Sequence, residues 1–528
     1  MLSDNSMIAS SSYYVGSPAV PTNLPDEHVV RRHKKKADIS YPLQEVIFGI
    51  FHYMGLVFVM LTNYLCLIPS IIIITYFYEN SFYWVTMLLA IPLGAIFFLL
   101  LRYLAIILCK KMILNRIKPG SYPLKSLYYI RHWIIGKMLD EDEIFIMADS
   151  LYFPMFLRRL GARLSKGVEM GETPHIIPDL VTIKEGGFTA SSVGLAWPSI
   201  YDGIVTFSNV RVGKKGFVGN VSLVPGGKEI GDSGLLGCLS LPPYNNQSAV
   251  AHSSWLGSPA VLLPKRELFT GYSEQQTYNP PRKLYIIRLL IEFFRIILPT
   301  TLSFVILFNL LYILDYMLST YSWKITALVL PVSELFITVA LVGALVGLKW
   351  LLLGKLKPLT KPIWDIFIWK NDIIEYSYNY FINPHLTNKI LGTPFALLIP
   401  RSMGTKAGKR VFTDSAEFSE FDLISLGDDV CINAETIIQT HLYEDRIFKV
   451  SQITINSDCN VGIGSIILYN TLMENNSSLG NLSLLMKGER LPSNTQWEGT
   501  PAQTKKIIPV STLNSPVKEL IPLSDNIV

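Results

Sequence analysis

The stretch Ile455-Asn-Ser-Asp-Cys-Asn-Val-Gly-Ile-Gly-Ser-Ile-Ile-Leu-Tyr-Asn-Thr-Leu-Met473 has an apolar side chain at every sixth position. The same rhythm continues after it at Leu479, Leu485 and Leu491, and runs before it at Leu426, Ile432 and Ile438. Neither an α-helix nor an alternating strand has a period of six. A parallel β-helix built of hexapeptides has it, because each short strand forms one flat face and its aliphatic side chain points into a stacked core.

The turns between these faces are expected at small and polar residues. Gly427-Asp428, Gly462 and Gly480-Asn481 follow apolar positions of the series, and such residues suit tight turns. An earlier stretch repeats the pattern, with apolar residues at Val212, Val218, Val224, Ile230 and Leu236. The sequence therefore predicts two β-helices.

These two regions belong to one internal duplication. Residues 161–241 align without a gap on residues 404–484 at a fixed offset of 243 positions. A second set of matches has an offset of 239: Trp84, Pro92, Lys118, Pro119 and Pro123 recur as Trp323, Pro331, Lys357, Pro358 and Pro362. The repeating unit therefore includes an apolar region, a Lys-Pro-x-x-x-Pro exit from it and a β-helix.

The composition points to a membrane protein. Half of the residues are hydrophobic and 16% are charged, whereas about a quarter is usual. The apolar residues concentrate in four runs, 57–77, 84–101, 296–314 and 325–348, and a helix needs about 20 apolar residues to cross a bilayer. We expect four spans in two pairs, one pair before each β-helix.

The positive residues predict the orientation. The joins within each pair, 78–83 and 315–324, are short, and the cations lie on the other side: Arg31 to Lys36, Lys110, Lys111, Arg116, Lys118, Arg282, Lys283, Arg288, Lys355, Lys357 and Lys361. Because cytosolic loops are enriched in Lys and Arg, both β-helices and both termini are expected in the cytosol. The net charge of +5 requires no partner other than anionic lipid, and no nucleic-acid partner is expected.

The predicted fold is thus membrane α-helical plus all-β, with two left-handed parallel β-helices of the trimeric hexapeptide-acyltransferase type. The expected order is a disordered basic tail (1–40), transmembrane pair 1 (41–117), an interfacial helix (118–150), β-helix domain 1 (151–262), a linker (263–288), transmembrane pair 2 (289–356), a second interfacial helix (357–390), β-helix domain 2 (391–505) and a C-terminal tail (506–528).

The two copies differ most at the centre of the repeat. The second copy has Gln439-Thr-His-Leu-Tyr-Glu-Asp-Arg446, whereas the first has inert Pro198 at the position of His441. The neutral imidazole of a histidine near pH 7 suits a general base. We therefore expect chemistry in the second copy, with His441 as the base, and interpret the first copy as degenerate.

Several neighbours of His441 are candidate site residues. Glu444 or Asp445 is expected to orient the imidazole, although the Glu-Asp-Arg string is also typical of a solvated loop. Arg446 is a candidate ligand for a phosphate or carboxylate of the acyl donor, together with Lys449, Gln439, Asn433 and Trp497. Trp497 equally suits a cap on the last coil, because Trp255 begins a matching turn in the first copy.

The remaining candidates have a structural alternative. His132 is interpreted as an interfacial histidine, and His175 and His252 as structural residues. Glu334 is the one acid within a span, where function and a wet groove are both open. No metal is expected, because a zinc site would need several converging ligands and one histidine is available. The five cysteines have neither disulfide nor zinc spacing.

Six motifs carry a resemblance to a known family: 422–427, 439–446, 482–489 and 497–502 in the second copy, and 174–183 and 255–260 in the first. They resemble the membrane-embedded C-terminal region of epsilon-poly-lysine-synthetase-like nonribosomal peptide synthetases, over about residues 40–505. The resemblance implies tandem acyltransferase-like domains that form amide bonds between an amine and an aminoacyl thioester.

The chain departs from that family in two respects. It has two β-helical copies where those synthetases have three, and residues 1–40 are too short for an adenylation or carrier domain. The donor is therefore expected to be a thioester made elsewhere, on a carrier or adenylation-carrier protein acting in trans or on coenzyme A. Two other functions stay open: an export protein with β-helical braces, and a non-catalytic scaffold.

Overall fold

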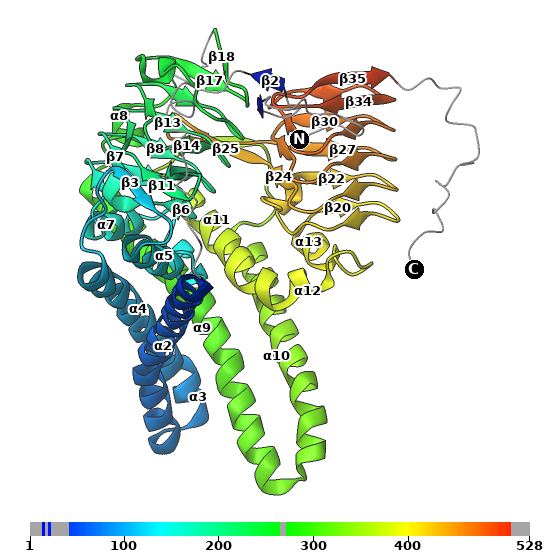
Figure 1. Cartoon of the computed structure of the whole chain (residues 1–528). Helices are drawn as coiled ribbons and strands as arrows, with labels where there is room; N and C mark the ends of the chain where they lie inside the picture. The colour runs from blue at the N-terminus through cyan, green and yellow to red at the C-terminus, as the bar shows by residue number, and fades with distance from the viewer. Residues whose placement is uncertain (1–12, 16–19, 23–41, 265–270, 508–528) are drawn as a thin grey trace, which may run out of the picture. The chain divides into compact units, whose positions relative to one another are not determined.

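The computed structural model describes residues 13–15, 20–22, 42–264 and 271–507 (Figure 1). The basic run 31–36 and most of the predicted C-terminal tail lie outside these residues. The chain divides into two compact units, the first comprising 1–390 with 442–449 and the second 391–441 with 450–528. Each unit is described by itself. A short antiparallel pair, β1 (Tyr13–Val15) and β2 (Val20–Thr22), precedes the first helix.

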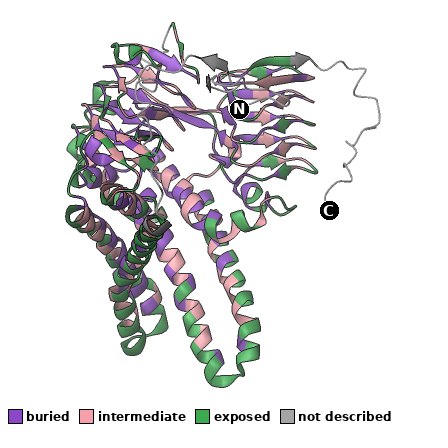
Figure 2. Cartoon of the chain, in the orientation of Figure 1, coloured by how far each residue is buried: buried purple, intermediate pink, exposed green. Residues whose placement is uncertain are grey.

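Four long apolar helices belong to the first unit. They are α2 (Pro42–Asn80), α4 (Ile91–Ile113), which follows α3 (Tyr83–Val85) and η1 (Thr86–Ala90), α9 (Arg282–Thr320) and α10 (Trp323–Leu352). All four runs predicted from the sequence fall inside them, and each helix is long and apolar enough to cross a membrane. Much of their apolar surface is exposed, as lipid contact requires (Figure 2).

Two of the cations counted for orientation are buried in ion pairs. Lys110 Nζ lies 2.9 Å from Asp179 Oδ2, and Arg288 Nη2 lies 2.9 Å from Glu169 Oε2. These charges fasten helix ends to the first β-helix rather than facing solvent. The orientation therefore rests on the exposed cations, such as Lys111, Arg116 and Lys355.

The first β-helix consists of three sheets that the chain visits in turn. Their strand orders are β4-β7-β12-β15, β5-β8-β13-β16-β17-β18 and β6-β9-β14. All neighbours are parallel except β17 and β18. The strands are β4 (Arg163–Leu164), β5 (Glu169–Met170), β6 (His175–Ile176), β7 (Val181–Ile183), β8 (Phe188–Thr189), β9 (Gly194–Trp197), β12 (Val210–Val212), β13 (Phe217–Val218), β14 (Leu223–Pro225), β15 (Glu229–Ile230), β16 (Leu235–Leu236), β17 (Ser254–Leu256) and β18 (Val261–Leu262).

The second β-helix repeats this order, and its coils are stacked from β20 to β35 (Figure 1). Its sheets are β20-β22-β27-β30-β33, β21-β23-β28-β31-β34-β35 and β24-β29-β32. The strands are β20 (Lys406–Ala407), β21 (Phe412–Thr413), β22 (Ile424–Leu426), β23 (Cys431–Ile432), β24 (Ile437–Gln439), β27 (Ile453–Ile455), β28 (Asn460–Val461), β29 (Ile466–Leu468), β30 (Thr471–Met473), β31 (Ser478–Leu479), β32 (Leu484–Leu485), β33 (Arg490–Leu491), β34 (Thr495–Glu498) and β35 (Gln503–Ile507).

The residues of the six-residue series form the two cores. From Ile455 to Leu491, all seven are at most 1% exposed, and the five of the first copy are equally buried. This confirms two parallel β regions with a hexapeptide rhythm. Their left-handedness stays a prediction.

The turns also recur every six residues, although not at the residues predicted. Positive φ angles occur at Asp458, Gly464, Asn470, Asn476, Leu482, Gly488 and Asn494. Gly462 has a different role: a Cβ there would lie 2.6 Å from the backbone nitrogen of Asn481 in the next coil. Glycine is required at this position for close contact between coils rather than for a left-handed turn.

Each β-helix carries one hairpin that leaves the coil. Leu426 pairs with Ile455 and Ile455 with Met473, which are steps of 29 and 18 residues, so the first coil holds eleven extra residues. The predicted loop after Ile438 is therefore an insertion into a regular coil. It forms β25 (His441–Glu444) and β26 (Ile447–Val450); β10 (Ser199–Tyr201) and β11 (Ile204–Phe207) are its counterparts in the first copy.

The hairpins pair with the Lys-Pro-x-x-x-Pro exits. These exits, expected as connections, form β3 (Gly120–Pro123) and β19 (Leu359–Pro362), which give the sheets β10-β11-β3 and β19-β26-β25. Leu124 N donates to Gly203 O and Ile363 N to Arg446 O, both at 2.9 Å. The copies therefore share this arrangement in detail.

Shorter helices connect these parts. They are α5 (Leu127–Leu139), α6 (Asp142–Phe145), α7 (Tyr152–Arg159), α8 (Glu274–Thr277), α11 (Ile366–Ser377), α12 (Asn388–Ile390) and α13 (Leu398–Met403), with η2 (Pro178–Leu180), η3 (Gln247–Ala249), η4 (Tyr378–Thr387) and η5 (Phe421–Leu423). In α5, His132 packs edge-on against Phe207, and burial lowers its pKa to about 4. A neutral packing histidine is therefore expected there at pH 7.

The membrane orientation predicts a labelling pattern. In a cysteine-free background, single cysteines at Asn80 and Ser319, which are exposed at the ends of α2 and α9, should react with a membrane-impermeant maleimide in intact cells. A cysteine at Ser493, exposed on the second β-helix, should react only after the membrane is permeabilised. Labelling of the Ser493 variant in unbroken cells would reverse the orientation.

Candidate active site

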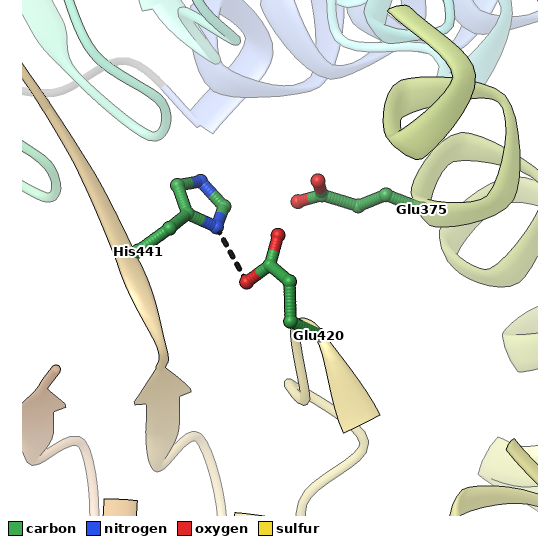
Figure 3. Close-up of side chains that lie close together, drawn as sticks. All are labelled: Glu375, Glu420 and His441. Atoms are coloured by element: carbon green, nitrogen blue, oxygen red, sulfur yellow. Dashed lines mark hydrogen bonds and ion pairs between the residues drawn. The ribbon is translucent and has the colours of Figure 1, made fainter. Parts of the chain in front are cut away.

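His441 stands where the hairpin leaves the second β-helix. It is the first residue of β25, and its side chain is buried. Its Nδ1 lies 2.8 Å from Oε2 of Glu420 (Figure 3). The structure thus pairs the predicted base with a carboxylate other than the two that the sequence suggested.

Glu420 comes from the preceding coil. Phe418 and Ile438 form a parallel bridge, which places Ser419-Glu420 beside Thr440-His441. The backbone of Glu420 has φ 33° and ψ 66°, a left-handed conformation that costs a non-glycine residue roughly 1–2 kcal/mol. Strain of this kind is often retained at functional sites, because the surrounding structure fixes it there.

Two hydroxyl groups complete a hydrogen-bonded cluster. Thr440 Oγ1 donates to Oε2 of Glu420 at 2.5 Å, and Ser419 Oγ lies 3.0 Å from Thr440 Oγ1. The backbone nitrogen of Thr440 donates to Ser419 Oγ at 3.2 Å. These bonds hold the carboxylate in place, so the imidazole faces an oriented acceptor. We name Ser419, Glu420, Thr440 and His441 the polar quartet.

The first copy lacks every member of the polar quartet. At the offset of 243 positions, the counterparts are Ile176, Ile177, Trp197 and Pro198. The difference between the copies is therefore a whole constellation rather than one residue. Comparing position 420 with position 177 in the sequence would have revealed Glu420, an acid opposite an aliphatic residue.

The acidic candidates of the hairpin have other partners. Glu444 Oε2 accepts a hydrogen bond from Lys449 Nζ at 2.7 Å. Asp445 and Arg446 form the tip, with φ angles of 49° and 64°. Glu444 and Lys449 therefore neutralise each other, and Asp445 shapes the turn.

Arg446 is buried in the first unit rather than exposed to solvent. Its guanidinium donates to Gly167 O, lies 3.7 Å from Glu169 Oε1 and 4.8 Å from the ring centroid of Tyr278. Burial lowers its pKa, and the charge of Glu169 opposes that shift. The guanidinium nevertheless stays charged, because arginine is not deprotonated in proteins.

The structure separates the other predicted donor ligands. Asn433 Nδ2 donates to Val461 O at 2.7 Å within the coil ladder. Trp497 lies on β34, three strands along the sheet from the β23 strand beside Asn433, which is about 14 Å at the usual strand spacing. Gln439 precedes the quartet directly, and its Oε1 is buried without a hydrogen-bond partner among the described residues. Gln439 is therefore the most suitable of the three to bind a ligand.

A cleft of about 800 Å³ lies in the first unit, with Arg446 in its wall. Six cationic side chains line it against three acidic ones: Arg158, Lys166, Lys214, Lys215, Arg282 and Arg446, with Glu169, Glu185 and Glu274. The aromatic rings of Tyr278, Tyr285 and Trp364 also line it. A cleft with this lining suits an anionic ligand that has apolar parts.

The remaining candidates have structural contacts. The ring of His175 lies 4.2 Å from that of Trp197, edge-on, and His252 is exposed. Glu334 lies 4.0 Å from Lys389, with both side chains partly exposed. None of these contacts involves a pocket residue that the structure describes.

The strand rhythm places both β regions in the hexapeptide-repeat class. The chain is homologous to a poly-amino-acid synthetase: it is 32% identical over 417 residues to Delta-poly-L-ornithine synthetase of Acinetobacter baumannii, which covers 79% of this chain. The chain spans 31% of the length of that relative. No protein-family model matches the chain.

Two solved structures share local likeness. One is AntD, an N-acyltransferase from Bacillus cereus solved with dTDP and coenzyme A; it has 14% identity, covers 21% of this chain and 90% of its own, and has a TM-score of 0.17. The other is a hexapeptide-repeat-containing acetyltransferase from Vibrio cholerae, with 17% identity, 33% and 93% coverage and a TM-score of 0.19. At these scores, neither adds to the topology of the strands themselves.

Proposed function

We propose that the protein is a membrane-bound acyl or aminoacyl transferase that forms an amide bond between an activated thioester and an amine. The observation that supports this most is the hydrogen bond between His441 and Glu420 in a buried, strained setting. The homology to a poly-amino-acid synthetase supports the substrate class, and makes an ornithine thioester a natural first donor to test.

In this proposal the polar quartet orients one imidazole nitrogen and leaves the other to react. Glu420 accepts the Nδ1 proton, so Nε2 of His441 carries the lone pair. Nε2 removes a proton from the amine as its nitrogen attacks the thioester carbonyl. The C–N bond forms, the C–S bond breaks, and the imidazolium returns the proton to the leaving sulfur. Glu420 stabilises the imidazolium, as the aspartate of a catalytic triad does.

The partner-free oxygen of Gln439 gives the second copy a specific contact for substrate. A buried acceptor without a partner costs about 1–3 kcal/mol, which a substrate N–H recovers when it binds. Because Gln439 adjoins the quartet in the chain, we assign it to binding of the amide or amine group. Its counterpart in the first copy, Ala196, offers no such acceptor.

The charge of the cleft in the first unit supports an anionic donor. A phosphopantetheine arm on a carrier protein, or coenzyme A, combines phosphate with an apolar chain, and guanidinium groups bind phosphate well. We propose that the cleft binds this donor. Lys449 is not among the residues that line the cleft, so the expected docking at Arg446 and Lys449 is restated here for the whole cationic wall.

The first prediction concerns catalysis. His441→Ala should lower the rate of amide formation by roughly 100-fold or more, because general bases typically contribute that much. Glu420→Gln should lower it by roughly 10-fold or more, since orienting partners carry effects of this size. Purified protein is incubated with a panel of aminoacyl thioesters and amines, and the amides are quantified by mass spectrometry.

Pro198→Ala is the matched control at the same position of the first copy, and its rate should equal that of the wild type. Full activity in His441→Ala, or equal losses in His441→Ala and Pro198→Ala, would exclude this assignment. Circular dichroism of each variant separates loss of chemistry from loss of fold.

The second prediction concerns the donor. Lys166→Glu and Arg282→Glu reverse exposed charges of the cleft wall, and should raise KM for the thioester while leaving kcat at saturating donor nearly unchanged. Higher ionic strength should act in the same way on the wild type, because it screens exposed charges. Lys283→Glu, exposed next to Arg282 but absent from the cleft lining, is the control. An unchanged KM in the cleft variants would exclude the cleft as the donor site.

A further inference from the structure

The β-helices begin with faces of the same geometry. Asp149 N donates to Met170 O and Gly392 N to Thr413 O, both at 2.9 Å and 243 residues apart. Arg158 donates to the carbonyls of Leu164 and Ser165, and Arg401 donates to their counterparts Ala407 and Gly408. Residues of the two faces can therefore be compared one by one. We name them the first and second entry faces.

The first entry face is covered by the repeat that follows it. Leu151 N donates to Glu292 of α9 at 2.9 Å, and Tyr152 Oη donates to Leu289 O at 3.1 Å. Arg288 of α9 donates to both oxygens of Glu169 at 3.0 and 2.9 Å. All these residues belong to the first unit.

The hairpin of the second copy covers the same face. The ring of Tyr443 lies 5.8 Å from that of Phe188, and Arg446 lies beside Glu169. The first entry face is thus held mainly by ion pairs with α9 and by one aromatic contact with the hairpin. It shows what a repeat of this kind binds.

The second entry face is exposed and apolar. Phe395, Leu398 and Phe412 replace Tyr152, Met155 and Glu169 of the first face, and are 60%, 55% and 42% exposed. Cys431 replaces Phe188. Large exposed apolar groups that gather on one face mark an interaction site. An acid that binds arginine in one copy is therefore a phenylalanine in the other.

The hairpin of the first copy is also exposed and apolar. Trp197, Ile200 and Tyr201 are 43%, 52% and 58% exposed. Ile200 is the counterpart of Tyr443, the residue that contacts Phe188, and Gly203 stands in place of Arg446. This hairpin has the shape of the docked one but lacks its charge.

We propose that a second copy of this chain completes both surfaces, with the hairpin of the first copy (Trp197, Ile200 and Tyr201) packed on the second entry face (Phe395, Leu398 and Phe412) of the partner. The contact repeats the internal one with apolar groups in place of ions. Two such contacts are equivalent and close a two-fold dimer. The chemical difference keeps each hairpin on its own face, because an unpaired Arg446 would be buried against Phe412 in the wrong pairing.

Dimer formation tests the proposal, independently of any activity. In detergent or nanodiscs, multi-angle light scattering should give the mass of two chains for the wild type and of one chain for Phe412→Glu. Ile463→Glu changes an apolar residue of the second β-helix that is 47% exposed outside the entry face, and should remain dimeric. A wild-type monomer, or a dimer that persists in Phe412→Glu, would overturn the proposal.

Crosslinking identifies the surfaces in contact. Ile200→Cys should be joined to native Cys431 of the other chain by a short bis-maleimide, giving a band of twice the mass on a denaturing gel. The band should disappear in Ile200→Cys with Cys431→Ser, and should be absent for Val250→Cys, which is 61% exposed elsewhere on the first β-helix. Equal crosslinking of Ile200→Cys with and without Cys431 would show that the dimer uses another surface.

Discussion

Each strand of these β-helices must bond to the strand one coil away, and this constraint controls where chemistry can arise. Regular coils step by 18 residues, as from Ile455 to Met473, and the spacing between coils is fixed by backbone hydrogen bonds. Additional residues can only leave the coil outward. The eleven-residue insertion does so, and it places His441 at the base of the hairpin, still rigidly attached to the core. A rigid base of this kind suits a catalytic group better than a free loop does.

The duplication separates the requirements of the fold from those of the site. Both copies keep the coil, the hairpin and the pairing of the hairpin with its exit strand, so these features serve architecture. Only the second copy has the polar quartet, and it retains strain at Glu420 in order to hold it. The entry faces diverge in a similar way, with ions at Glu169 and an apolar surface at Phe412. One scaffold thus carries two different specialisations.

The sequence predicted the features that depend on local periodicity, and missed those that depend on contacts between distant residues. The hexapeptide rhythm and the four apolar helices are visible in composition and spacing alone. Glu420 lies 21 residues from its partner His441, and becomes adjacent only when one coil stacks on another. Arg446 was expected at the surface because its string is charged, whereas Glu169, far away in the sequence, allows its burial. Gly462 was interpreted as a turn residue, because the coil that crowds it is invisible to local reasoning.

The central claim is that the reacting thioester is bound beside His441 in the second copy. A cryo-electron microscopy structure of the full chain with a non-hydrolysable aminoacyl-pantetheine analogue and the acceptor amine tests it most directly. We expect density for the analogue's carbonyl group within hydrogen-bonding reach of the amine at Nε2 of His441, and none at Pro198 of the first copy. Density for the reacting group beside Pro198, or at a site away from the polar quartet, would contradict the account.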